Sequence, residues 1–178
     1  LDGRPNDMTM ILDSAFKREP SLDVRGVSWA WGLFEYGVEP DAWPDWMHES
    51  VARSANNPWS SPAAPLLAFF CALDRGDEGT VRQLAQRNRH EVGRLMRGYV
   101  SAYFDADAGT ASAEASGVTV SAQEDSPRLL RDLVLARVAA LNGDQAGAMR
   151  WFDAIAADIN SAGPKPYWER LLRRCIRT

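Results

Sequence analysis

The chain has 178 residues, of which 46% are hydrophobic and 25% charged, the composition of an ordinary globular protein. Its formal net charge of −4 excludes the basic footprint of a general nucleic-acid-binding protein, so we expect no nucleic-acid partner. Two cysteines are too few for a disulfide framework, and the absence of an apolar run of about 18 residues argues against membrane insertion within this segment.

The start of the chain bears on its origin. It reads Leu-Asp-Gly-Arg-Pro, with neither an initiator Met nor a basic stretch followed by an apolar one, so we expect a piece of a longer protein. Arginine outnumbers lysine eighteen to two and alanine is abundant, which indicates a GC-rich bacterial genome. These residues leave the compartment open between the bacterial cytoplasm and the periplasm.

The first 60 residues predict three amphipathic helices, because apolar residues recur there at helical spacing. The expected helices are 8–16 (Met8, Ile11, Leu12, Ala15 and Phe16, ended by Pro20), 21–36 (Val24, Val27, Trp31 and Phe34, ended by Gly37) and 46–54 (Trp46, Met47, Ser50, Val51 and Ser54, ended by Asn56-Asn57-Pro58). A turn over residues 38–44 separates the second helix from the third.

Two later segments each predict a helical hairpin: a Ser-Pro start, a helix, a Gly turn and an Asp that caps the next helix. The expected parts are Ser61-Pro62, helix 63–75, Gly76 and Asp77 in the first hairpin, and Ser126-Pro127, helix 128–142, Gly143 and Asp144 in the second. A turn this short allows only antiparallel packing of the two helices.

The segment between these hairpins is less regular. Residues 92–103 form a clean apolar stripe, but residues 110–123 are rich in Ala, Ser, Thr and Gly, and Val118-Thr119-Val120 is the only strand-like triplet. We therefore expect one all-α domain over 1–178. It has tryptophan-rich helices over 1–60, hairpins over 61–105 and 126–178, and either a weak helix or a linker over 106–125.

The spacing of three glycines and the positions of small residues resemble a known helical repeat. Gly76, Gly109 and Gly143 are 33 and 34 residues apart. Residues 129–160 place Ala136 and Ala148 at small positions and Phe152 at a large one. Over that stretch the chain resembles the tetratricopeptide repeat, whose period is 34 residues. The resemblance implies antiparallel hairpins stacked as a short right-handed superhelix, with small residues allowing close helix approach.

No arrangement of residues predicts a catalytic, cofactor or metal site. His48 and His90 are each followed by Glu, but a zinc-binding helix needs a second His four residues on. Carboxylates near the tryptophans resemble the pair that glycosidases use, yet Asp41 and Asp45 stand beside prolines where helix caps belong. We expect capping or surface roles for these residues, and buried hydrophobic roles for Cys71 and Cys175.

The tryptophans and the last helix supply the candidate binding residues. Five of the seven tryptophans lie between residues 29 and 59, and Trp43, Trp46 and Trp59 flank turns marked by proline. They predict either helix packing or an aromatic platform for a peptide or sugar ring. In the last helix, Arg170, Arg173, Arg174 and Arg177 form a basic stripe, which predicts a solvated helix end or a contact for an acidic partner.

Two hypotheses for function follow. The first is a non-catalytic tetratricopeptide-like interaction or scaffold domain that binds a protein or peptide through these tryptophans and arginines. The second is a periplasmic accessory domain of a larger bacterial membrane-bound glycan polymerase or oligosaccharyltransferase, families that often end in hairpins of this kind. Residues 50–88 are loosely similar to them in layout, with an Asn-Pro break, an apolar helix, a Gly turn and an amphipathic helix.

Overall fold

The structure is a computed structural model that describes residues 5–18, 26–56, 63–89, 91–120, 125–161 and 166–176. Within these residues the chain forms ten α-helices and one short 3-10 helix, and no strand. The all-α prediction is therefore confirmed. Val118, from the strand-like triplet, is instead buried in the helical core.

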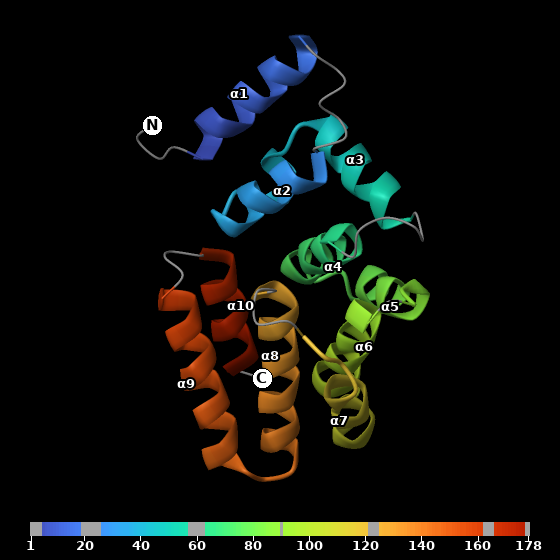
Figure 1. The fold of residues 1–178 in the computed structure, drawn as a ribbon, viewed down its shortest axis with the longest axis vertical. Helices are drawn as coiled ribbons and strands as arrows, with labels where there is room; N and C mark the ends of the chain where they lie inside the picture. The colour runs from blue at the N-terminus through green and yellow to red at the C-terminus, as the bar shows by residue number, and fades with distance from the viewer. Residues whose placement is uncertain are drawn as a thin grey trace.

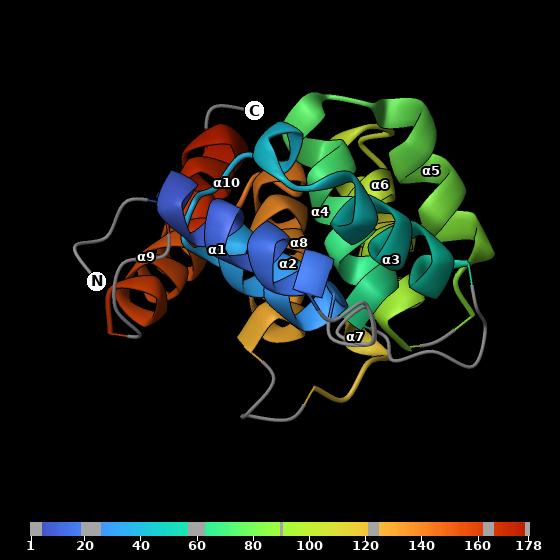
Figure 2. The ribbon, with the colours of Figure 1, turned by 90° about the horizontal axis from the view of Figure 1, so that it is seen from above.

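Each helix packs against the next along the chain, and α1 is the outermost (Figures 1 and 2). The elements are α1 (Pro5–Arg18), α2 (Gly26–Glu35), the 3-10 helix η2 (Pro40–Ala42), α3 (Asp45–Ala55), α4 (Ala63–Arg75), α5 (Glu78–Arg87), α6 (Glu91–Tyr103), α7 (Ala108–Ser116), α8 (Asp125–Leu141), α9 (Gln145–Ser161) and α10 (Pro166–Ile176). The pairs α4–α5, α6–α7 and α8–α9 are hairpins with short turns.

These three turns share one construction. Each contains a residue in the left-handed region, Gly76 at φ 71°, Ala106 at φ 52° and Gly143 at φ 81°. Glycine suits this conformation because it has no Cβ to collide with the following carbonyl. The predicted glycine turns are thus confirmed at Gly76 and Gly143, whereas the middle hairpin uses an alanine.

An aspartate follows each left-handed residue and caps the next helix. The carboxylates of Asp77, Asp107 and Asp144 accept hydrogen bonds from the backbone N–H of Thr80, Thr110 and Gly147 at 3.0, 3.0 and 2.7 Å. The caps predicted at Asp77 and Asp144 are confirmed. Gly109 lies inside α7, so the residue equivalent to Gly76 is Ala106, 30 positions later and 37 before Gly143. The even glycine spacing therefore does not relate equivalent turn positions.

Two other boundaries differ from expectation. Helix α8 begins at Asp125, so Ser126 lies in its first turn rather than before it; Pro127 is tolerated there because the first N–H groups of a helix have no intrahelical partner. The segment 106–125 contains α7, and residues 117–120 after it are not helical. Ser61-Pro62 lies outside the described residues.

The last helix returns to the beginning of the fold. In α10 the Tyr167 ring lies 3.9 Å from that of Phe34 in α2, and its hydroxyl donates to the Phe70 carbonyl of α4 at 3.4 Å. The Cys175 sulfur lies 3.8 Å from the Tyr99 hydroxyl of α6. Because α10 also packs on α8 and α9, it joins helices that are far apart in the sequence.

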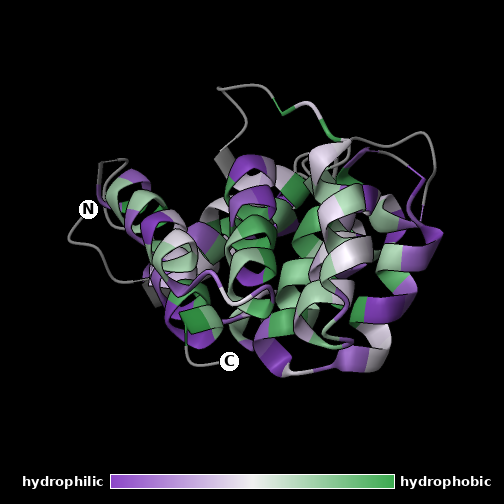
Figure 3. Ribbon diagram, turned by 90° about the horizontal axis from the view of Figure 1, so that it is seen from below, coloured by the Kyte–Doolittle hydropathy of each residue, from purple (hydrophilic) through white to green (hydrophobic). Residues whose placement is uncertain are grey.

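Apolar residues gather where the helices meet (Figure 3). The largest fully buried side chains include Trp168 and Tyr167 of α10, Phe34 of α2, and Phe69 and Phe70 of α4. The core is therefore centred on the contact of α2 and α4 with α10. Helix α1 lies outside this centre, which leaves a cavity on its inner side.

Candidate functional site

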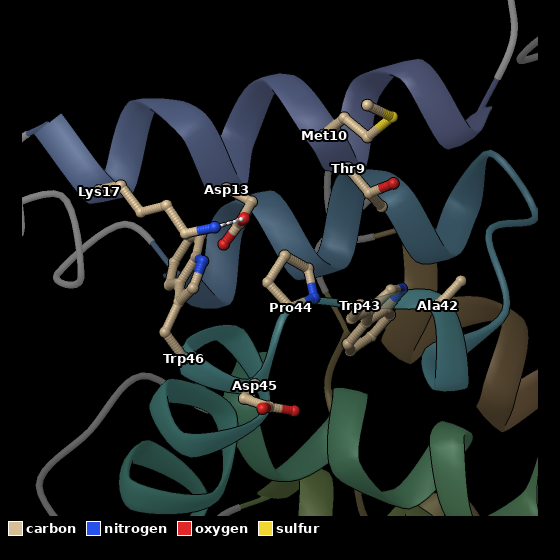
Figure 4. Close-up of a pocket in the computed structure, with 9 residues that line it drawn as sticks. All are labelled: Thr9, Met10, Asp13, Lys17, Ala42, Trp43, Pro44, Asp45 and Trp46. Carbon is tan, nitrogen blue, oxygen red and sulfur yellow. Dashed lines mark ion pairs between the residues drawn. The ribbon is translucent and has the colours of Figure 1, made fainter.

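The candidate site is a cavity of about 490 Å³ between α1 and the segment that runs from η2 into α3 (Figure 4). Its lining residues are Thr9, Met10, Asp13 and Lys17 of α1, and Ala42, Trp43, Pro44, Asp45 and Trp46 opposite them. The Pro40 and Pro44 punctuation predicted a turn here, and that turn positions two tryptophans against α1. We call this cavity the α1 groove.

The wall formed by α1 is not the face that its periodicity predicts. Among the α1 side chains that the structure describes, only Thr9 is buried, and Leu12 and Phe16 pack partly against the core. Met8 and Ile11, which belong to the predicted apolar stripe, are 40% and 55% exposed, and Met10 is 71% exposed. Helix α1 is thus rotated so that part of its apolar surface remains open to solvent.

The floor of the α1 groove is aromatic, but the ring faces are occupied. The Trp46 ring stacks on Phe16 with centroids 4.3 Å apart and meets the edge of Trp29 at 5.9 Å. Trp43 contacts Phe34 edge to face at 6.2 Å. Only 5% of Trp43 and 8% of Trp46 is exposed, so neither is the half-exposed platform that the sequence allowed; the surrounding aromatic rings explain this.

Both tryptophans bring an unused hydrogen-bond donor to the α1 groove. The indole Nε1–H groups of Trp43 and Trp46 are buried and find no acceptor among the residues that the structure describes. Figure 4 shows the nitrogen-bearing edges of both rings turned toward the α1 side of the cavity. Burying a donor without an acceptor costs free energy, because its hydrogen bond to water is lost and not replaced. Most buried polar groups therefore have a partner. These two donors lack an acceptor within the described residues, but they are buried, so a ligand can reach them only if α1 moves outward.

The charge of the groove is negative. Among the described residues of its lining, Lys17 is the only cation, and its ammonium pairs with the Asp13 carboxylate at 2.6 Å, one helical turn away. Asp45 lines the groove and is exposed, and the exposed carboxylates of Asp41 and Glu49 lie in the same η2–α3 segment. With Lys17 paired, the described lining keeps a net negative charge through Asp45; we call the exposed carboxylates of Asp41, Asp45 and Glu49 together the acidic rim.

The described arginines of the predicted basic stripe on α10 make contacts within the chain. The Arg174 guanidinium donates to the Leu73 carbonyl at 2.6 Å, at the end of α4. Arg173 pairs with Glu169 of its own helix at 3.2 Å. Arg170, Arg173 and Arg174 thus make contacts inside the chain, while Arg173 and Arg174 also remain exposed to solvent. Trp59 and Arg177, the remaining predicted binding residues, lie outside the described residues.

Arg170 lies between two carboxylates, at 3.4 Å from Glu39 and 3.5 Å from Asp74. Burial raises the pKa of Glu39, and the nearby Asp74 adds to this increase, while Arg170 opposes it. The cluster connects α10 to α4 and to the turn after α2. Its arginine stabilises this junction, which the basic stripe alone did not predict.

The histidines and cysteines are the other groups with reactive side chains. Within the part of the chain that the structure describes, no three His, Cys, Asp or Glu side chains are placed to hold a metal. His48 packs against Trp43 with centroids 5.6 Å apart, and His90 lies outside the described residues. Cys71 and Cys175 are buried and unbridged; burial raises the pKa of Cys71 to about 12 and also raises that of Cys175. Their nucleophilic thiolate forms are thus disfavoured.

The α1 wall was missed at the sequence level. Thr9, Met10, Asp13 and Lys17 share one side of a helix, and the i,i+4 spacing of Asp13 and Lys17 was a readable sign of a polar face. The sequence could not predict that η2 and the start of α3 form the other wall of the groove, because they meet α1 only through tertiary packing.

None of the helices in the described residues combines the length and apolar character needed to cross a membrane. Comparison of the chain with family models, with curated proteins and with solved structures finds no match.

Proposed function

We propose that this chain is a non-catalytic, tetratricopeptide-like interaction domain that binds a protein or peptide partner. In this proposal the hairpins stack as a short right-handed superhelix. The burial of the repeat's small and large residues supports it: Ala136 of α8 and Ala148 of α9 are buried where the two helices pack, and Phe152 of α9 is part of the core. The tight Gly-Asp turns at both ends of the stack are also consistent with repeated hairpins.

The observation that carries the proposal is the α1 groove. Met8, Met10 and Ile11 leave a methionine-rich apolar surface exposed on the helix that forms one wall. Flexible methionine side chains adapt to different partners and are common on binding surfaces. An exposed apolar patch beside an acidic rim is typical of a protein interaction site.

Site-specific photo-crosslinking tests this location. A photoreactive amino acid replaces Met10 in the groove or Met149, a similarly exposed methionine on α9. In native lysate we expect a crosslinked protein from position 10 that is absent from position 149 and is competed away by excess unlabelled domain. Equal crosslinking from both positions, or none from position 10, would contradict the proposal.

A further inference from the structure

Resting on the proposed function, we propose that the α1 groove recognises an extended, basic peptide segment. The bound segment has free backbone carbonyls facing Trp43 and Trp46, and lysine or arginine side chains facing the acidic rim. An apolar residue of the peptide lies against Met10.

The two indole donors favour an extended peptide over a helix. The Nε1–H groups of Trp43 and Trp46 need acceptors, and the described residues provide none. A helical ligand bonds its own carbonyls internally, except in its last turn. An extended or polyproline-type segment keeps its carbonyls unbonded, and aromatic-lined grooves bind such segments.

The ring contacts argue against a sugar. Carbohydrate recognition by tryptophan uses an open aromatic face, but Phe16 covers Trp46 and Phe34 packs against Trp43. The nitrogen-bearing edge of each ring, which a ligand reaches when α1 moves outward, offers a hydrogen bond rather than a stacking surface. A glycan contact, which the tryptophan-rich sequence allowed as an alternative, is therefore disfavoured at this groove.

Charge complementarity argues for a basic segment. Asp41, Asp45 and Glu49 are exposed on the η2–α3 side, while Lys17, the only cation among the described lining residues, is paired with Asp13. An arginine or lysine of the peptide gains from these carboxylates, and an acidic peptide is repelled. Arginine offers the larger gain because its planar fork binds a carboxylate through two hydrogen bonds.

Access to the donors requires an outward movement of α1, because both indole nitrogens are buried. Helix α1 suits this role. It fully buries only Thr9 among its described side chains and makes fewer contacts with the fold than the inner helices do. Elements with few buried apolar contacts open at low free energy.

A selection from random peptides tests the class of ligand. Peptides displayed on phage are selected on the whole domain and counter-selected on the double variant Asp45→Lys, Glu49→Lys. We expect the retained sequences to be enriched in arginine, lysine and proline. Retained sequences that are acidic or that carry a helical apolar pattern would overturn this inference while leaving the groove as the binding site. No retained sequence at all would count against the proposed function as well.

Trp→Phe variants test the donors, because phenylalanine keeps an aromatic ring and removes the N–H. With a selected peptide, Trp43→Phe and Trp46→Phe should each weaken binding about threefold to tenfold, the value of one neutral hydrogen bond. Trp151→Phe on α9 is the matched control and should leave binding unchanged. In the proton–nitrogen spectrum, the indole resonances of Trp43 and Trp46 should shift on peptide addition while that of Trp168 stays.

The outcomes separate the two proposals. Unshifted Trp43 and Trp46 resonances with a bound peptide would refute the groove as the binding site. Shifted resonances with no loss of affinity in either Trp→Phe variant would refute the role of the indole donors alone. Far-UV circular dichroism of each variant checks that the helices remain folded.

Discussion

The left-handed alanine in the α6–α7 turn gives a stability prediction with an unusual sign. Ala106 has φ 52°, where an L side chain crowds its own backbone, whereas the equivalent turns use Gly76 and Gly143. The left-handed conformation costs an alanine roughly 1–2 kcal/mol, and the greater freedom of unfolded glycine offsets about 0.4–1 kcal/mol of that. Ala106→Gly should therefore raise the free energy of unfolding by about 0.5–1 kcal/mol.

The reciprocal change should act in the other direction. At Gly143 the added Cβ of Gly143→Ala meets no atom within 4 Å, so backbone strain alone sets its effect. We expect a loss of about 1 kcal/mol, which corresponds to a melting temperature lower by about 3 °C at this chain length. Ala106→Gly and Gly143→Ala are thus reciprocal substitutions at equivalent turn positions, and they should change the free energy of unfolding in opposite directions.

The matched control is Ala113→Gly, which makes the first substitution at an exposed position inside helix α7 of the same hairpin. Glycine inside a helix should lower stability by about 1 kcal/mol. Urea unfolding followed by circular dichroism and by tryptophan fluorescence gives all three values. If Ala106→Gly destabilises the protein as much as Ala113→Gly does, the left-handed assignment at Ala106 is wrong.

Three further predictions concern charge and thiols. Hydrogen bonds, chiefly from Arg97, hold the pKa of Glu114 below its ordinary value of 4.5, so this carboxylate stabilises the fold above that pH and loses its contribution as pH falls through the folded pKa. Urea unfolding across acidic pH should therefore show a steeper loss for wild type than for Glu114→Gln. Arg174→Met should lower the free energy of unfolding by about 1 kcal/mol, because the hydrogen bond to the Leu73 carbonyl of α4 is lost. Arg173→Met should change it by less than about 0.5 kcal/mol, because Arg173 is exposed and pairs with Glu169 of its own helix. Equal effects of the two substitutions would show that the bond to α4 does not stabilise the fold. Both cysteines should resist a thiol reagent in the native protein and react after denaturation; rapid native reaction would contradict their burial.

Local chemistry made much of the fold predictable. The turn glycines, the capping aspartates and the end of the third helix near Asn56 follow from conformational preferences within a few residues. The middle hairpin was the exception, because Ala106 carries no sign of a left-handed turn and Gly109 offered a misleading one. Its true signal was Asp107, which caps α7 just as Asp77 caps α5.

The candidate site was predictable only in part. The sequence singled out Trp43 and Trp46, but it gave no indication that Phe16 stacks on Trp46, that Phe34 packs against Trp43, or that both rings are almost fully buried. The rotation of α1 was equally hidden. Its periodicity is a property of one helix, whereas the face that it buries depends on which neighbours offer space.

The amino-acid sequence by itself determined that this protein is helical, where most helices begin and end, and how hairpin turns are built, because these features depend on neighbours three or four residues apart. Tertiary structure decided how the surface is used. Arg174 is exposed, as the sequence predicts, and it also donates to the carbonyl of Leu73, 101 residues earlier. Contacts across such separations arise only when the whole chain packs. They connect arginines of α10 to α4 and to the turn after α2, whereas α1 packs loosely enough to leave the α1 groove beside it.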